Sequence, residues 1–304
     1  MGAARHGYSR GKRRWRCTAC GKTFIISGML ARRDRQRIWF KRWICEGYSM
    51  RQLEIQSGYC HSTLRRIRSY WLSRPPIGSL DLSRYKHLVI DGTYFDGRQS
   101  SVVGVCDTFL GTMVDGRYGI KEGGHKMAEW CLELREAGLM PESITIDGLP
   151  QVETILRVLW PGATIQRCLV HIQRQGLAWC RRDPKRAAVV HLRRLFMKVK
   201  NIGTCGERDE FIANWRKWEE RFGKQVDSRP ERGRVFSDVK RARSLLLHAL
   251  PNMFHYLDNS KIPSDTNWLE SYFSRLKSKY RQHRGLSKKN RLNYFSWYFY
   301  TCRK

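Results

Sequence analysis

Long apolar runs are missing from this sequence of 304 residues. A membrane-spanning helix needs about twenty consecutive apolar residues, and no such stretch is present. The basic residues near the N-terminus are not followed by the apolar segment of a secretory signal. N-myristoylation would need Ser or Thr where the sequence has His6. These absences predict a cytoplasmic protein.

Acidic residues are also scarce. The 27 Asp and Glu residues are outnumbered by 58 Lys and Arg residues, which leaves a formal net charge of +31 at pH 7. Such an excess attracts polyanions and speeds encounter with them. Because 41% of the residues are hydrophobic and 12% are aromatic, the chain can still build a folded core. The composition predicts a folded nucleic-acid-binding protein with about two domains.

Ten cysteines are dispersed along the chain, which favours reduced thiols and metal ligands over a disulfide framework. Cys17 and Cys20 form a C-x-x-C pair followed by Gly21, a basic residue and an aromatic, which is the pattern of a zinc knuckle. Zinc needs four ligands, and only His6 lies nearby as a substitute for a second pair. Two interpretations stay open: residues 1–24 are a partial zinc-ribbon-like segment that binds Zn²⁺, or the pair binds nothing.

Residues 34–76 have the periodicity of paired helices. Ser49 and Gln52 fit a capping box, and Gly58 permits a sharp turn before a second short helix. That helix is expected to pack Leu64, Ile67 and Trp71 inward and to display three basic residues outward: Arg65, Arg66 and Arg68. An ordinary helical hairpin is the alternative. The Gly turn and the arginines together favour a helix-turn-helix DNA-binding domain.

The periodicity changes after the helix-breaking segment Arg74–Gly78. The predicted strands are Lys86–Phe95, Ser101–Cys106, Gly111–Ile120, Ser143–Asp147 and Thr164–Val170, with helices at Lys126–Ala137 and Val152–Trp160. Asp96-Gly97 predicts a hairpin turn, and Asp115-Gly116 a further turn or bulge. This β-β-β-α-β-α-β order predicts a mixed sheet with helices on both faces.

The remaining sequence is predicted to be helical. From about Ala178 to Tyr256 it is basic and has no strand pattern, and after Asp265-Thr266-Asn267 it begins an amphipathic helix. Four aromatic residues of the C-terminal half are expected in the core rather than stacked on bases: Trp215, Trp218, Trp297 and Tyr298.

Two aspartates stand out in so basic a chain. Asp91 closes the apolar part of the first strand, and Asp147 closes the fourth. If these strands are parallel neighbours, the carboxylates meet at one edge of the sheet and a divalent cation would offset their repulsion. Carboxylate oxygens favour Mg²⁺ or Mn²⁺. Each Asp taken alone could instead cap a turn, which is the alternative to a site.

A third carboxylate across that edge would complete a site for two metal ions. Glu270 is the candidate, because it lies on a capped helix among basic residues. In such a site one ion activates the attacking hydroxyl and the other stabilises the leaving 3′ oxygen.

Five short segments occur in a specific order over about residues 85–300. They are Val-Ile-Asp-Gly-Thr at 89–93, Thr-Ile-Asp-Gly at 145–148, Gln-Arg-Cys-Leu-Val-His at 166–171, Thr-Asn-Trp-Leu-Glu at 266–270 and His-Arg-Gly-Leu-Ser at 283–287. This order resembles the Mutator-like group of bacterial insertion-sequence transposases, which are DDE transposases. The C-x-x-C pair and the helix-turn-helix pattern upstream fit the same family.

The resemblance implies a ribonuclease-H-like fold for the mixed five-stranded sheet. The catalytic domain would comprise residues 80–177 and 259–304, interrupted by an all-helical insertion over residues 178–258. Asp91, Asp147 and Glu270 would be the metal-binding triad. Cys168 and His171 match the family's C-x-x-H signature near the active site. They are not expected to be catalytic, because a strand Cys is usually core and the His could contact phosphate or hold the insertion.

The implied reaction is in-line phosphoryl transfer with two Mg²⁺ or Mn²⁺ ions and without a covalent protein–DNA bond. Water would free a 3′-OH at the transposon end, and that hydroxyl would attack target DNA. The partners would be double-stranded DNA and further copies of the chain, as a homodimer or larger synaptic complex near the nucleoid. Four basic residues after the triad are expected to bind DNA backbone, a solvated helix face being the alternative: Arg275, Lys277, Lys279 and Arg281.

Two other functions remain as alternatives. A transposase-derived DNA-binding regulator would keep the helix-turn-helix without cleavage, and the intact triad argues against it. A ribonuclease-H-like nuclease, such as a Holliday-junction resolvase, would need neither the helix-turn-helix nor the helical insertion.

Overall fold

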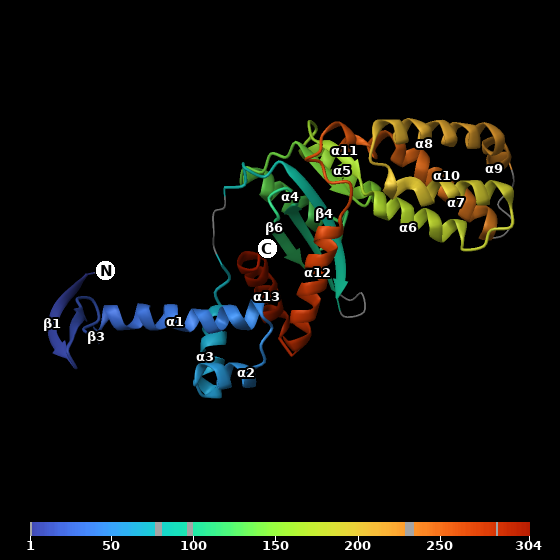
Figure 1. Ribbon diagram of the computed structural model, residues 1–304. Coiled ribbons are helices and arrows are strands. Elements are labelled where there is room, and N and C mark those ends of the chain that lie inside the picture. The colour runs from blue at the N-terminus through green and yellow to red at the C-terminus, as the bar shows by residue number, and fades with distance from the viewer. Residues whose placement is uncertain (1, 77–80, 96–99, 229–233, 284) are drawn as a thin grey trace. The chain divides into compact units, whose positions relative to one another are not determined.

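The computed structural model describes residues 2–76, 81–95, 100–228, 234–283 and 285–304. The chain divides into two compact units, which Figure 1 shows coloured along the chain. One comprises Met1–Pro76 and Leu276–Thr301, and the other comprises Ile77–Arg275 and Cys302–Lys304. No helix in the described part of the chain has the length and apolar character to cross a membrane.

The first unit begins with a three-stranded antiparallel sheet, in the order β1 (Ala3–Ser9), β2 (Lys12–Cys17), β3 (Thr23–Phe24). Four helices follow: α1 (Ile26–Cys45), α2 (Met50–Ser57), α3 (His61–Leu72) and the C-terminal α13 (Lys288–Thr301). Helices α1, α3 and α13 pack through aromatic rings, with Trp297 meeting Phe40 edge-on at 5.2 Å between centroids. The predicted capping box of Ser49 and Gln52 starts α2, and Gly58 ends it with φ of +67°.

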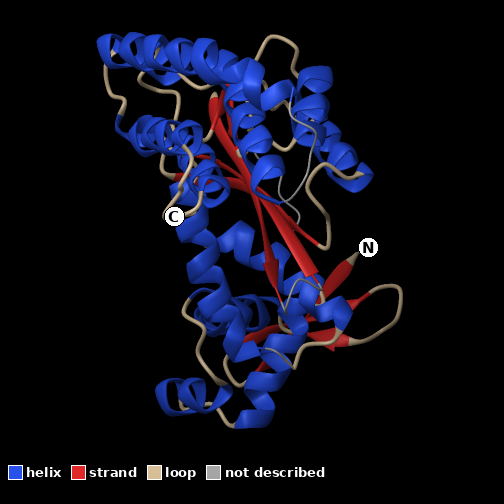
Figure 2. Ribbon diagram, turned by 90° about the vertical axis from the view of Figure 1, so that its right-hand side faces the viewer, coloured by secondary structure: helices blue, strands red, loops and turns tan. Residues whose placement is uncertain are grey.

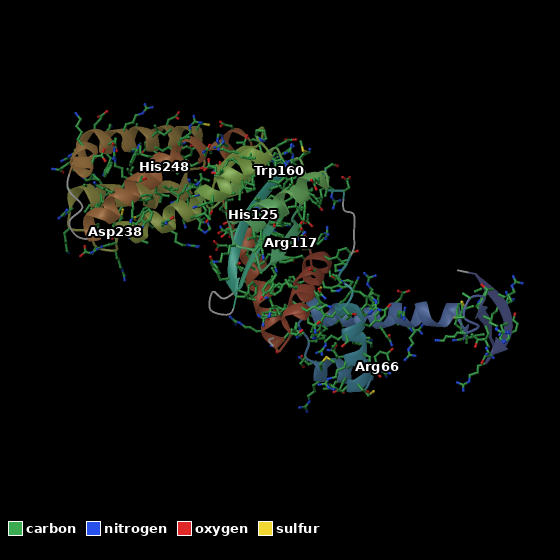
Figure 3. The ribbon with its side chains drawn as sticks, turned by 180° about the vertical axis from the view of Figure 1, so that it is seen from behind. Arg66, Arg117, His125, Trp160, Asp238 and His248 are labelled. Atoms are coloured by element: carbon green, nitrogen blue, oxygen red, sulfur yellow. The ribbon has the colours of Figure 1, made fainter. Side chains whose placement is uncertain are left out.

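The second unit is built on a five-stranded mixed sheet, drawn with red strands in Figure 2. Its order is β6 (Thr112–Tyr118), β5 (Ser100–Asp107), β4 (His87–Phe95), β7 (Ser143–Ile146), β8 (Thr164–Arg167). The first three strands are antiparallel, and β4, β7 and β8 are parallel. Helices α4 (His125–Glu136) and α5 (Pro150–Leu159) bury Trp130 and Leu156 in the core of this sheet. The indole N–H of Trp160, labelled in Figure 3, donates to the carbonyl of Leu139 at 2.8 Å.

A helical segment lies between β8 and the last part of the chain, and Figure 1 shows its long helices side by side. It comprises α6 (Leu169–Cys180), α7 (Ala187–Lys198), η2 (Val199–Asn201), α8 (Cys205–Trp218), the π-helical turn η3 (Glu219–Gly223), α9 (Lys224–Ser228), α10 (Arg234–Ala249), η4 (Leu250–Asn252) and α11 (His255–Asp258). The segment has its own hydrophobic core, which includes Trp215 and Trp218. Helix α12 (Asn267–Tyr280) and η5 (Arg281–His283) follow.

The predicted order of strands and helices is confirmed, and so is the mixed sheet. The predicted bulge is confirmed in the third strand, where the pairing with β5 shifts immediately before Asp115. The aromatic residues predicted for the core, including Trp297 and Tyr298, are buried. The predicted Asp96-Gly97 turn lies outside the described residues.

Three predictions need correction. The fifth strand ends at Arg167 rather than Val170, because the backbone turns at Cys168 into helix α6. Cys168 is therefore the residue before a helix and not a strand residue. Eight cysteines are free thiols as expected, whereas Cys45 and Cys302 are disulfide-bonded.

Candidate active site

Asp91 lies on β4, and Asp147 directly follows the neighbouring parallel strand β7, one residue beyond the strand end where the sequence had placed it. The paired residues include Val89 and Thr145, and each aspartate follows its paired residue by two positions. Strand β7 ends at Ile146, so Asp147 begins the loop to α5, where its Oδ1 accepts a hydrogen bond from the N–H of Leu149 at 3.0 Å. The two carboxylates therefore meet at one level of the sheet.

Asp91 is held in a buried, acidic environment. Its side chain is only 6% exposed, although the pairing with β5 continues beyond it to Phe95. Burial, and then the charge of Glu122, raise the pKa of Asp91 to about 8, and the charges of Asp147 and Glu270 act in the same direction. The N–H of Gly92 donates to the carboxylate at 2.9 Å and opposes this rise. All three predicted carboxylates are thus close enough to interact electrostatically.

Glu122 is a fourth carboxylate of this cluster, which the sequence analysis missed. It lies in the loop between β6 and α4, half-buried, with its carboxyl group against the backbone of Gly92. A Cβ atom at Gly92 would come within 2.6 Å of the Glu122 Cδ, so the Gly is required for this approach. Burial, and then the charge of Asp147, raise the pKa of Glu122 to about 7. An acidic residue in a loop belongs to no periodic pattern in the sequence. The one local signal is the Gly-Gly pair that follows Glu122, which is typical of a tightly packed loop.

The loop that carries Glu122 packs between β4 and the start of α5. Gly123 has φ of +68°, and a Cβ there would lie 2.6 Å from the Cβ of Gln151 at the start of α5. The Gly123 N–H contacts the sulfur of Met127 at 3.2 Å. Close packing on both sides fixes the Glu122 backbone between Gly92 of β4 and Gln151 of α5.

Glu270 enters the cluster from helix α12, and its side chain is turned toward an imidazole and a guanidinium. Its Oε1 lies 3.6 Å from Nε2 of His171 and 3.4 Å from Nη1 of Arg174. Within the described part of the chain, no group of three or more His, Cys, Asp or Glu that could hold a metal ion is found. Glu270 therefore interacts electrostatically with Asp91, but its carboxylate oxygens are not grouped with those of the other described acids as metal ligands.

The C-x-x-H pair orients the imidazole that faces Glu270. The Nδ1 of His171 lies 3.2 Å from the sulfur of Cys168 and 3.4 Å from the hydroxyl oxygen of Thr266. Because these groups hold one ring nitrogen, the other is directed at Glu270. Burial raises the pKa of the Cys168 thiol, so this thiol stays neutral. The structure therefore gives Cys168 a positioning contact.

A buried guanidinium lies beside Asp147. Arg167, at the end of β8, donates from Nη2 to the carbonyl of Asp147 at 3.4 Å. It packs over Gly148, where φ is +94° and a Cβ would lie 1.8 Å from the Arg167 Cζ. Its Nε is buried and, among the described residues, has no hydrogen-bond partner. An unpaired buried donor next to an acidic cluster is suited to an anionic ligand.

Comparison with known proteins connects this arrangement to one family. Residues 61–278, more than half of the chain, match the family model described as "Transposase, Mutator family". The chain belongs to the Mutator family of transposases. The transposase for insertion sequence element IS905 from Lactococcus lactis subsp. lactis (strain IL1403) is 27% identical over 146 residues, 44% of this chain. The match spans 37% of the length of that relative.

In this Mutator-family chain, the basic residues predicted to bind DNA differ in exposure. On α3, Arg65 and Arg66 are exposed (Figure 3 labels Arg66). Arg68 is half-buried, with its guanidinium 5.8 Å from the ring of Trp43, so the predicted outward display is wrong for this residue. The wider apolar face of α3 takes in the stem of Arg68.

On the later helix, the cations differ in the same way. Arg275 and Arg281 are exposed, and Lys277 and Lys279 are half-buried. The Nζ of Lys279 donates to the carbonyl of Glu46, just after α1, at 3.1 Å. This lysine therefore has a structural contact within the first unit.

The two N-terminal cysteines lie at the end of β2 and in the turn that follows. Gly21, with φ of +68°, closes that turn by donating its N–H to the carbonyl of Cys17 at 3.0 Å. Backbone N–H groups of Cys20 and Ala19 lower the pKa of Cys17. The turn thus favours a thiolate, and the described residues around it supply no set of three metal ligands.

Proposed function

We propose that this protein is a DNA transposase that cleaves DNA at transposon ends and joins the freed 3′-OH to target DNA. Asp91, Asp147 and Glu270 are its metal-binding residues, and Glu122 is a fourth acid of the same site. The observation that carries the proposal is the parallel pairing of β4 and β7, which brings Asp91 and Asp147 to one level, with two further carboxylates acting on Asp91.

The donor set fits Mg²⁺ or Mn²⁺. Carboxylate oxygens are the hard ligands that these ions prefer. The charges of the other three acids raise the pKa of Asp91, and a cation among the four would offset this repulsion. Two bound divalent ions would supply activation of the attacking hydroxyl and stabilisation of the leaving oxygen. Ligation by Glu270 requires its carboxylate to exchange contacts with His171 and Arg174, since both now face it.

The residues around the acids position the reacting groups. His171, held by Cys168 and Thr266, orients the Glu270 carboxylate through its other ring nitrogen. Arg167 places a cation beside Asp147, and its unpaired Nε can donate to a phosphate oxygen. These contacts restrict rotation of the acidic side chains and keep a DNA phosphate near them.

Different segments of the chain have different roles in this proposal. We assign a ribonuclease-H-like fold to the five-stranded sheet, with the catalytic residues in 80–177 and 259–304 and an all-helical insertion at 178–258. Residues 34–76 form the helix-turn-helix DNA-binding domain, and residues 1–24 a partial zinc ribbon whose Cys17 and Cys20 supply two Zn²⁺ ligands. Exposed Arg65, Arg66, Arg275 and Arg281 bind DNA backbone. Cleavage of two ends in one event calls for a homodimer or larger synaptic complex.

The test is nicking of a labelled duplex that carries the element's own end, with Mg²⁺ or Mn²⁺. Wild type is compared with Asp147→Ala and with Asp183→Ala, which removes an exposed acid of the helical segment. We expect metal-dependent nicking by wild type and Asp183→Ala, and none by Asp147→Ala despite unchanged DNA binding. Binding without nicking by all three proteins would contradict the proposal and favour a DNA-binding regulator.

A further inference from the structure

A basic cleft lies in the helical segment, away from the acidic cluster in the sequence. It has a volume of about 370 Å³ and is formed by α7 on one side and by α8 and η3 on the other. Its basic side chains are Arg194, Lys198, Lys217 and Arg221, with His191 beside them. Trp218 and Phe222 form the apolar floor. The cleft therefore combines an apolar floor with a rim of cations.

The cations of the rim are arranged as two facing pairs. Arg194 and Lys198 are four residues apart on α7, and Lys217 and Arg221 are four residues apart across the α8–η3 junction. Like charges at this spacing repel each other on a helix, which costs stability unless an anion lies between them. Lys198 has an acidic partner, Glu210 at 3.0 Å. Within the described parts of the chain, no carboxylate forms an ion pair with the other three.

Two acids near the cleft, Glu219 of the π-helical turn and Asp227 of α9, are paired with a cation outside it. Glu219 makes a two-pronged ion pair with Arg243 of α10, and Asp227 contacts the same guanidinium at 3.0 Å. Gly223 allows this pairing, because a Cβ there would lie 2.4 Å from the Glu219 Oε1. The π turn presents Arg221 and Phe222 to the cleft, while Glu219 is paired with Arg243. Such turns are frequent at functional sites.

Two further hollows lie beside the cleft along α7. A second hollow of about 310 Å³ shares Phe222 with it and is lined by Arg186, Val189 and Gln225. A third, of about 200 Å³, shares Lys198 but is lined by the acids Glu207 and Glu210, so the basic surface ends there. A basic surface that follows much of a helix of 12 residues suits a chain-like ligand better than a compact one. Such a helix is about 18 Å long, a length that holds roughly five phosphates of one DNA strand.

We propose that this cleft, lined by Arg194, Lys198, Lys217 and Arg221, binds the sugar-phosphate backbone of DNA and is a second DNA-binding surface of the protein. The cations bind phosphate oxygens, and the apolar floor accommodates deoxyribose. Phosphate contacts carry no sequence information, so binding by these cations is independent of sequence. The inference rests on the proposed function only in taking DNA as the polyanion.

The test compares two double variants in the full-length protein. Lys217→Gln with Arg221→Gln removes two cations of the cleft. Arg216→Gln with Lys224→Gln removes two cations from the same run of helix that do not line it. Affinity for a fluorescent duplex of arbitrary sequence is measured by anisotropy over a range of salt concentrations. A plot of the log of the binding constant against the log of the salt concentration has a negative slope, and its magnitude falls by about 0.9 for each phosphate that the protein no longer neutralises.

The slope for the cleft variant is expected to fall by about 1.8, because two phosphates at about 0.9 each are no longer neutralised, while the control variant keeps the wild-type slope. Equal slopes for the two variants would overturn the inference, and so would calorimetric binding of inorganic phosphate by wild type without a slope change on DNA. Thermal unfolding of each variant excludes a folding defect. If wild type nicks DNA in the presence of metal but the two variants have equal slopes, only DNA binding by the cleft is contradicted. If the slope falls in the cleft variant but wild type does not nick DNA, only the proposed reaction is contradicted.

Discussion

Replacing Asp91 with Asn is expected to stabilise the metal-free protein while abolishing DNA cleavage. Burial, and then the charge of Glu122, raise the pKa of Asp91 from 3.8 to about 8. A carboxyl group whose pKa is higher in the folded than in the unfolded state costs stability once the pH exceeds the unfolded value. This cost grows until the pH reaches the folded value. The uncharged amide of Asn avoids it.

The size of the effect follows from the two pKa values. At pH 7 the group is ionised in the unfolded chain and mostly protonated in the folded one, a span of about three pH units above 3.8. At about 1.4 kcal/mol per unit, this costs up to about 4 kcal/mol. At pH 5 the same reasoning leaves less than about 2 kcal/mol. The stabilisation by Asp91→Asn should therefore grow with pH across this window.

Thermal unfolding in EDTA at several pH values measures this difference. For a unit of this size, each kcal/mol corresponds to about 2–4 °C in Tm. Asp107→Asn is the control, because Asp107 is also buried, on the neighbouring strand, and its Oδ1 accepts the N–H of Leu110 at 2.9 Å. Added Mg²⁺ should raise the Tm of wild type more than that of Asp91→Asn. A lower Tm for Asp91→Asn, or a difference that does not change with pH, would refute the reasoning.

Three further outcomes are expected. Glu122→Gln should lower Mg²⁺-dependent nicking by at least about tenfold, or about 1.4 kcal/mol, without changing DNA affinity; wild-type nicking would exclude a role for this acid. Thr266→Val removes one of the two contacts that hold the imidazole of His171 and should reduce nicking roughly ten- to a hundredfold, with recovery in Thr266→Ser; no recovery would point to a packing defect. Gly176→Ala places a Cβ 2.1 Å from a phenylalanine ring on α7 and should cost about 1–3 kcal/mol in urea unfolding. Gly206→Ala, with open space around it, should not destabilise; an equal destabilisation by both would contradict the packing argument.

Much of the fold could be predicted, because local periodicity encodes it. Alternating and continuous apolar runs predicted the five strands, and Gly58 and the capping box predicted the ends of α2, since these signals depend on neighbours in the chain. Cys168 was placed on a strand because its neighbours are apolar. At the turn, the N–H of Leu169 donates to the carbonyl of Ser264, 95 residues later, at 2.9 Å, a contact that no local pattern marks.

The acidic cluster divides in the same way. Asp91 and Asp147 were found from the sequence because each follows an apolar strand, and Glu270 because the family resemblance marks it. Glu122 was missed, since its place beside Gly92 arises only when the loop before α4 packs between β4 and α5. The inward turn of Arg68 and the hydrogen bond of Lys279 to a carbonyl also depend on partners distant in the chain.

Sequence alone determined the basic character of the chain, the order of its elements, the two strand aspartates and the resemblance to Mutator-like transposases. These properties depend on residue type and on spacing within a few residues. The tertiary structure decided which charges face one another. It placed the fourth acid beside Asp91, directed the imidazole of His171 at Glu270, and paired Glu219 with Arg243 outside the cationic cleft. Electrostatic interaction depends on distance in space and on burial, and both are set only when the chain has folded.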